Sequence, residues 1–227
     1  MNKGFFADAL ASRPLLWEAV LRANSFRASS PAPLSCATEA AALFGEAAAP
    51  FLAWLAERPA TVRCGHKEQD GTFWDYVEES RRLALLNTET LSALSLVAGV
   101  ALHAPDIARV LRREEVQALR SGIGENMYRY ALCRGQYQLG GVRRLFARLH
   151  PSLPLTERCA LHGSMAPRLV ATRWPDELAK RFLSKLPPLP EGTQMPALDE
   201  VEVRNLWLAL KKLLLKEVAP SWAPCFE

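Results

Sequence analysis

Residues 88–103 read TETLSALSLVAGVALH, and this stretch decides the fold. From its sixth residue onward nearly every side chain is apolar, whichever face of a helix it would occupy. A helix without a polar face must be surrounded by other protein, so the stretch predicts the central helix of a core. Asn87 or Thr88 would cap its start, and His103 would cap its C-terminus. Gly99 indicates close approach by a neighbouring helix.

Helical signals continue on both sides of this central stretch. Pro105 and Asp106 fit the first turn of a following helix. Pro167 should break or bend the helix in which it lies. Residues 28–35 and 186–197 are punctuated by proline and indicate linkers. The expected helices are 38–54, 105–111, 114–120, 125–133, 142–149, 155–172, 175–185 and 198–218.

These signals predict an all-α protein, a compact multi-helix domain around a buried central helix. We expect one domain over residues 1–227, with 1–58 as an N-terminal helical portion and 186–197 as the linker before the C-terminal helix. Residues 60–76 lack helical periodicity and contain Asp70-Gly71. A small β-hairpin is therefore an alternative to a loop there.

Composition excludes several classes of protein. The chain has 227 residues, 49% of them hydrophobic, and a net charge of only +4 spread along the sequence. That charge is too weak and too dispersed to favour a nucleic-acid-binding surface. The five cysteines are widely spaced and odd in number, which favours reduced thiols in a cytosol. We find no signal peptide and no stretch that we expect to insert into a membrane, so a cytoplasmic location is predicted.

The C-terminal helix carries two apolar stripes. Val201, Leu208 and Leu215 are spaced by seven and lie roughly 140° from the broad core face at 100° per residue. Two interpretations remain open: the helix is sandwiched inside the protein, or the second stripe docks a partner. The broad core face consists of Val203, Leu206, Trp207, Leu210, Leu213, Leu214 and Val218.

Arginines cluster just after the central helix. Arg109, Arg112 and Arg113 lie within five residues of one another. Solvated side chains are one interpretation, and contact with an acidic surface of a partner protein is the other, because Arg forms bidentate pairs with carboxylates.

Motifs that carry chemistry are sparse. Cys64, His66, Cys159 and His162 could supply a tetrahedral zinc site, but the two pairs are far apart and Cys-x-His is an unusual half-site. The sequence does not reveal whether the four side chains converge. We expect no metal, no cofactor, no small-molecule substrate and no enzymatic activity. A small helical enzyme with a Cys/His site and a helical nucleic-acid-binding regulator remain the alternatives.

Two stretches resemble a known family. Residues 94–132 (LSLVAGVALHAPDIARVLRREEVQALRSGIGENMYRYAL) are similar to the corresponding region of the SctK proteins of type III secretion systems. These proteins are also called YscK-like or PscK-like. Residues 212–227 (KLLLKEVAPSWAPCFE) resemble the closing pattern of that family, and Arg181, Leu183 and Leu186-Pro187 also fit. The resemblance covers about the last 140 residues and lies in the order and spacing of helix patterns.

The resemblance implies a non-enzymatic adaptor of the cytosolic sorting platform of an injectisome, a virulence-associated protein-transport machine. Such an adaptor bridges the inner-membrane ring protein SctD and the pod protein SctQ, at the inner-membrane base of the apparatus. It would act by protein–protein interaction. Partner-binding residues would then be sought among Val201, Leu208, Leu215, Arg109, Arg112 and Arg113.

Overall fold

A computed structural model describes residues 12–23, 49, 53 and 73–226. The described residues form helices and turns without a strand, which confirms the all-α prediction. The chain divides into two compact units, residues 1–85 with 223–227 and residues 86–222. The predicted helix 38–54 and linker 28–35 lie outside the described residues apart from Ala49 and Ala53. Of the alternative hairpin at 60–76, only 73–76 are described, and they form no strand.

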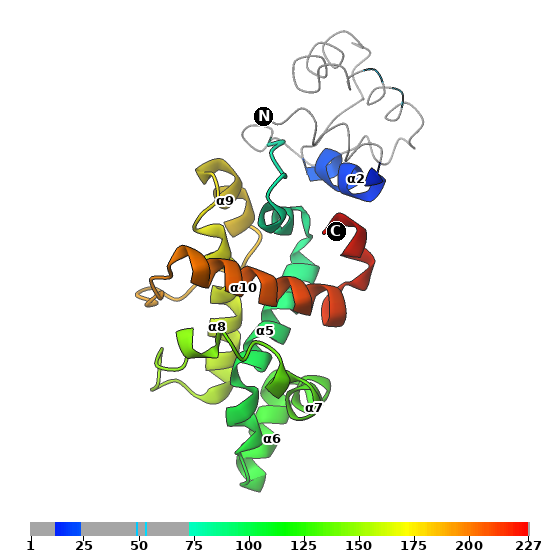
Figure 1. Cartoon of the computed structure of the whole chain (residues 1–227). Helices are drawn as coiled ribbons and strands as arrows, with labels where there is room; N and C mark the ends of the chain where they lie inside the picture. Colours follow the sequence, from blue (N-terminus) through cyan, green and yellow to red (C-terminus); the bar gives the residue numbers. More distant parts are fainter. Residues whose placement is uncertain (1–11, 24–48, 50–52, 54–72, 227) are drawn as a thin grey trace. The chain divides into compact units, whose positions relative to one another are not determined.

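Three helices make the core of the second unit. The predicted central helix is α5 (Thr88–Ala108), and it lies alongside α8 (Leu155–Ala171). Helix α10 (Glu200–Leu213) crosses both of them (Figure 1). The side chain of Asn87 accepts a hydrogen bond from the backbone N–H of Thr90 at 2.8 Å, so the expected N-cap is confirmed.

Two glycines let α5 and α8 approach each other closely. A Cβ atom added to Gly99 would lie 1.8 Å from the backbone oxygen of Cys159, and one added to Gly163 would lie 2.1 Å from that of Ser95. Neither position can therefore hold a side chain unless the helices separate. The close approach predicted at Gly99 is confirmed.

Helix α5 does not end at His103, and Pro105 does not begin a new helix. Pro105 lies inside α5, which continues to Ala108. Proline has no N–H, so the carbonyl of Ala101 four residues earlier loses its helical partner. Arg143 replaces that partner, donating from Nε at 3.3 Å and from Nη2 at 3.0 Å. The predicted capping role of His103 is wrong, because α5 continues for five residues beyond it and its ring contacts His162 on α8.

The connecting helices follow the expected order with some differences. Helices α6 (Arg113–Ile123) and α7 (Glu125–Cys133) are separated by Gly124, whose φ of 86° favours glycine. Of the predicted helix 142–149, only the short 3₁₀ turn η5 (Arg143–Leu145) forms. Pro167 does not break α8, which runs through it. Another 3₁₀ turn, η4 (Gly135–Tyr137), follows α7, and α9 (Asp176–Leu183) confirms the helix expected at 175–185.

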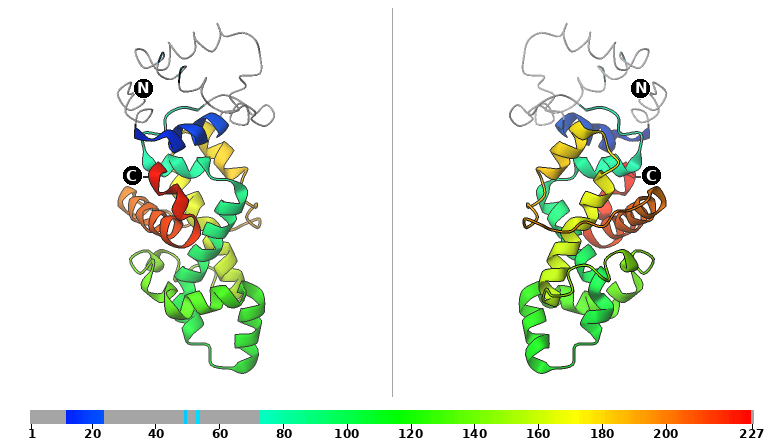
Figure 2. Two further views of the ribbon diagram at one scale, coloured as in Figure 1. Left: turned by 90° about the vertical axis from the view of Figure 1, so that its right-hand side faces the viewer. Right: turned by 90° about the vertical axis from the view of Figure 1, so that its left-hand side faces the viewer.

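The C-terminal helix begins later than predicted and changes type before it ends. Asp199 and Glu202 form a reciprocal capping box at the start of α10. Residues 214–218 form a π-helical turn, η6 (Leu214–Val218), closed by a 2.7 Å bond from the Ala219 N–H to the Leu214 carbonyl. Residues 187–197 contain no helix, as expected of a proline-rich linker. Figure 2 shows this segment passing beside α8.

The described part of the first unit contains a buried arginine. Arg82 lies on the 3₁₀ helix η3 (Glu79–Leu85) and donates to the carbonyls of Tyr76 at 3.1 Å and Cys225 at 2.9 Å. Cys225 ends the 3₁₀ helix η7 (Pro220–Cys225), so this bond ties the chain's C-terminal end to η3. Helix α2 (Pro14–Ala23) contributes Leu16, Trp17 and Val20 to the buried side chains.

Helix α5 is also long and apolar enough to cross a membrane by length and composition. However, 67% of its most apolar 18-residue window is buried against other parts of the chain. A core helix of a soluble protein has the same two properties, so this observation is weak evidence for a membrane span.

Candidate functional site

Three histidines form a hydrogen-bonded row where α5 and α8 cross. Nε2 of His103 on α5 lies 2.9 Å from Nδ1 of His162 on α8. Nε2 of His162 in turn lies 3.1 Å from Nδ1 of His150. At the other end, Nδ1 of His103 lies 3.5 Å from the Oδ2 atom of Asp106. We call this row, Asp106–His103–His162–His150, the histidine ladder.

The carboxylate at one end decides the tautomer of every ring. A hydrogen bond to the Asp106 carboxylate requires a donor, so Nδ1 of His103 carries the proton and its Nε2 accepts. His162 must then donate from Nδ1 and accept at Nε2, and His150 must donate from Nδ1. The remaining nitrogen, Nε2 of His150, is left as an acceptor. It is buried and has no hydrogen-bond partner within the described part of the chain.

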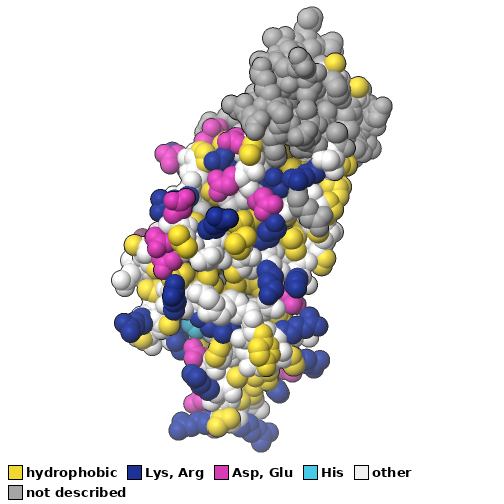
Figure 3. Space-filling model, viewed as in Figure 1, with side chains coloured by type: hydrophobic (Ala, Val, Ile, Leu, Met, Phe, Trp, Pro, Cys, Tyr) yellow, Lys and Arg dark blue, Asp and Glu magenta, His cyan; other side chains and the backbone are white. Residues whose placement is uncertain are grey.

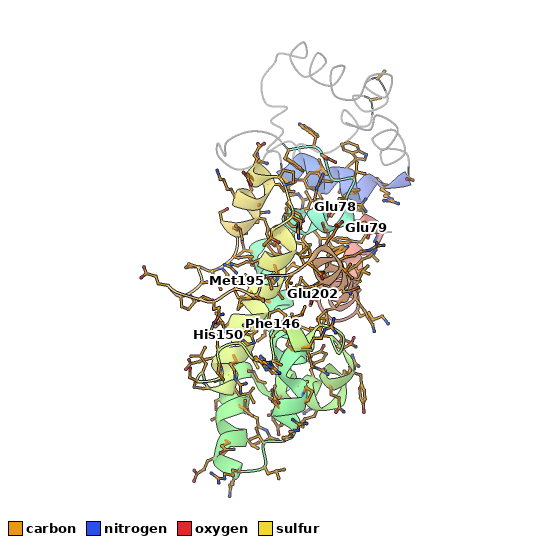
Figure 4. The ribbon with its side chains drawn as sticks, turned by 60° about the vertical axis from the view of Figure 1, so that its left-hand side comes forward. Glu78, Glu79, Phe146, His150, Met195 and Glu202 are labelled. Carbon is orange, nitrogen blue, oxygen red and sulfur yellow. The ribbon has the colours of Figure 1, made fainter. Side chains whose placement is uncertain are left out.

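The loop between α7 and α8 positions the outer end of the ladder. Phe146 is buried, with its ring centroid 5.5 Å from that of His162 (Phe146 and His150 are labelled in Figure 4). His150 has φ of 51°, in the left-handed region that a non-glycine residue rarely occupies. Arg143 holds this loop by donating from Nη2 to the carbonyls of Gly135 at 2.9 Å and Gln136 at 2.8 Å, and to that of Gln138.

Burial sets the electrostatics of the ladder. His162 is fully buried, and desolvation together with the neighbouring rings of His103 and His150 lowers its pKa to about 3. Burial also lowers the pKa of His103, although the hydrogen bond to Asp106 opposes this shift. The inner two rings are therefore neutral at pH 7, as the pattern of N–H···N bonds requires.

The predicted Cys/His pairs are only partly described. Cys64 and His66 lie outside the described residues. Cys159 and His162 are both buried in α8, and burial raises the pKa of the Cys159 thiol to about 12. Within the described ranges, no group of three or more His, Cys, Asp or Glu side chains could hold a metal ion.

The second apolar stripe of α10 lies partly in solvent. Val201 is 65% exposed and Leu208 is 50% exposed, whereas Leu215 is half-buried. Their own unit therefore leaves this face of α10 partly open. Six of the seven predicted core-face residues are buried, and Val218 is half-buried.

The three predicted arginines lie at the end of the unit formed by α6 and the α5–α6 turn. Arg109, Arg112 and Arg113 are all exposed, and between them Leu111 is 89% exposed. Figure 3 shows Lys and Arg side chains gathered around this end. Arg109 and Arg112 each lie 3.7 Å from one carboxylate oxygen, of Asp106 and Glu115 respectively. Such long, exposed pairs leave the guanidinium groups available to a partner.

Sequence reasoning did not identify the histidine ladder. The sequence patterns place His103 at a helix end and group His162 with Cys64, His66 and Cys159, and they assign no role to His150. One signal was present: His103 and His162 each lie within one helical turn of a glycine that lets α5 and α8 approach. A glycine in an apolar helix indicates that another helix crosses there, but it does not show which helix that is.

No family model matches the chain, and no curated protein or solved structure is significantly similar to it.

Proposed function

We propose that this chain is a non-enzymatic adaptor of a type III secretion sorting platform, similar to SctK, that joins an SctD-like ring protein to an SctQ-like pod protein. The observation that carries the proposal is the exposure of Val201 and Leu208 on α10, whose opposite face is buried. The resemblance of residues 94–132 and 212–227 to the SctK family supports the choice of partners.

The α10 stripe has the physical character of a docking surface. Two aliphatic side chains two helical turns apart remain partly in water, although their helix is anchored along its other face by side chains such as Leu206 and Leu210. Burying one such side chain under a partner stabilises a complex by about 1.5–3 kcal/mol. Exposed Arg204 and Lys212 flank the stripe and would contribute a polar rim.

The arginine end provides a second surface for an acidic partner. This end combines positive charge with an apolar anchor, because exposed Leu111 lies in the sequence between the exposed residues Arg109, Arg112 and Arg113. Because Arg forms bidentate bonds to carboxylates, the surface suits an acidic protein. An adaptor that joins two proteins needs two such surfaces.

The alternative of a Cys/His enzyme has less support. A thiol whose pKa is raised to about 12 is protonated at neutral pH, and the thiolate is the reactive form. Cys159 is also buried, so a substrate would not reach it.

Binding of the full chain to purified SctQ-like and SctD-like proteins tests the proposal. The double change Val201→Ser and Leu208→Ser should weaken binding to one of these partners by at least ~30-fold, because two desolvated anchors are lost. Leu183→Ser is a matched control, since Leu183 on α9 is 40% exposed and lies off the stripe. A chain that binds neither partner would contradict the proposal.

Deletion in the bacterium provides an independent test. Loss of an adaptor should abolish secretion while the membrane rings still assemble. Normal secretion in the deletion strain would exclude this role.

A further inference from the structure

A groove runs beside the outer end of the histidine ladder. It encloses about 670 Å³ between α8, the loop that precedes it and the proline-rich segment. Met195, labelled in Figure 4, lies further along the same proline-rich segment. The α8 groove, as we call it, is lined by His150, Ser152, Leu153, Glu157, Ala160, Leu161, Ser164 and residues 187–193.

The proline-rich wall offers few hydrogen-bond donors. Pro187, Pro188 and Pro190 have no N–H. Thr193 uses both of its donors within the wall, because its N–H and its hydroxyl bond to the Pro190 carbonyl at 3.2 and 2.6 Å. Hydrogen-bond acceptors are therefore in excess on this side of the groove.

The opposite wall shows a weaker form of this bias. His150 donates its single N–H to His162, so its ring offers the groove no donor. The hydroxyl oxygen of Ser164 accepts from Nη1 of Arg168 at 2.7 Å, and its own O–H remains a donor. Arg168 itself is buried behind the wall, where it also bonds the Pro187 carbonyl and joins the two walls.

The charges that line the groove have one sign. Glu157 and Glu191 are exposed carboxylates, and among the described residues no Lys or Arg lines the groove. In a chain of net charge +4 this is a local reversal. Leu153, Leu161 and Leu189 make the rest of the lining apolar. The groove is therefore complementary to an apolar ligand that has N–H donors and a positive charge.

The exposure of the walls favours a protein segment over a free small molecule. Ser152, Glu157, Ala160 and Glu191 are all exposed, although pockets for small ligands usually bury most of the ligand surface. We propose that the α8 groove binds an apolar segment of another protein that carries a Lys or Arg side chain. This inference does not rest on the proposed secretion role.

Fluorescence anisotropy with the full chain tests the inference. The probe is the labelled peptide Gly-Leu-Leu-Arg-Leu-Leu-Gly, compared with peptides that carry Lys, Gln or Glu at the centre. The Arg and Lys peptides should bind roughly tenfold more tightly than the Gln peptide, as expected for two partly exposed charge pairs. The Glu peptide should bind most weakly. Equal affinities for the Arg and Glu peptides would overturn the inference.

Two double variants locate the interaction. Glu157→Gln with Glu191→Gln should remove the preference for Arg over Gln, and Glu157→Lys with Glu191→Lys should reverse the preference between Arg and Glu. The matched control is Glu114→Gln with Glu177→Gln, which changes the net charge equally at exposed positions outside the groove lining. Loss of the preference in the control would show a general charge effect and would contradict the site.

A final comparison separates a protein segment from a free amine. 4-Phenylbutylamine combines an apolar group and a cation without a peptide chain. It should displace the Arg peptide only at concentrations at least ~100-fold above the dissociation constant of that peptide, since it covers much less of an open groove. Displacement at equal concentration would assign the groove to small amines and overturn the choice of a protein segment.

Discussion

Nε2 of His103 and Nδ1 of His162 lie 2.9 Å apart, so a hydrogen bond between two neutral imidazoles joins the two longest helices of the core. His103 follows Gly99 by one helical turn and His162 directly precedes Gly163, the two glycines that bring the backbones together. Stability should therefore depend on the protonation of these rings and on the glycine contact.

The chain should lose stability as the pH falls below 6.5. The pKa of His162 is lowered from 6.5 to about 3, so between these values the unfolded chain binds a proton that the folded chain does not. The free energy of unfolding is therefore unaffected by this group well above pH 6.5, and it is about 2 kcal/mol smaller at pH 5. His103, whose pKa is also lowered, acts in the same direction. Urea unfolding at pH 7.5 and pH 5.0 measures the difference.

The variant His162→Phe provides the control for this pH effect. It removes the titrating group, so the slope of the unfolding free energy between pH 5.5 and pH 4 should fall by about 1.4 kcal/mol per pH unit. An unchanged slope would show that His162 is protonated in the folded chain.

Gly99→Ala should destabilise the second unit by about 3 kcal/mol, because its Cβ would meet the backbone oxygen of Cys159, which cannot rotate away. Gly140→Ala is the comparison, since a Cβ there meets nothing within 4 Å and its effect should stay within about 0.5 kcal/mol. Chemical denaturation measures both. Similar losses at the two positions would argue against a tight helix crossing.

Arg143 and Pro105 should be coupled. Arg143→Gln removes donors from the carbonyls of Ala101, Gly135, Gln136 and Gln138, and should cost about 3 kcal/mol. Pro105→Ala restores an N–H partner for the carbonyl of Ala101. In that background the loss of Arg143 should cost about 1 kcal/mol less. A double-mutant cycle in urea measures the difference. Strict additivity would mean that Arg143 does not replace the missing N–H.

Among the described cysteines, only Cys133 should react quickly with iodoacetamide in the folded chain. Cys133 is exposed, whereas Cys159 and Cys225 are buried with pKa values raised to about 12 and about 11. The thiolate is the nucleophile, so both burial and protonation protect the other two. Peptide mass spectrometry after a short labelling at pH 7.5 gives the reactivity of each cysteine. Rapid labelling of Cys159 would contradict the packing of α8.

Local pattern was sufficient to predict a buried central helix, though not its end, and the close approach at Gly99, because an apolar surface on every side and a glycine within it have direct structural meanings. The effects of Pro105 and Pro167 were not predictable in this way. Arg143, which satisfies the freed carbonyl of Ala101, is 42 residues away in the sequence. The histidine ladder is a similar case, since His103 and His162 are 59 residues apart. Long-range partners of this kind are determined by packing and are not visible in a short motif.

The glycine crossing also has a consequence for tracing descent. A pair of helices that touch backbone to backbone allows little change at either contact, while surface positions can drift freely. Related chains should therefore keep these four residues: a glycine with a histidine one turn later, as at Gly99 and His103, and about sixty residues further on a histidine followed directly by a glycine, as at His162 and Gly163. Chains that have diverged everywhere else could still be grouped by those four positions.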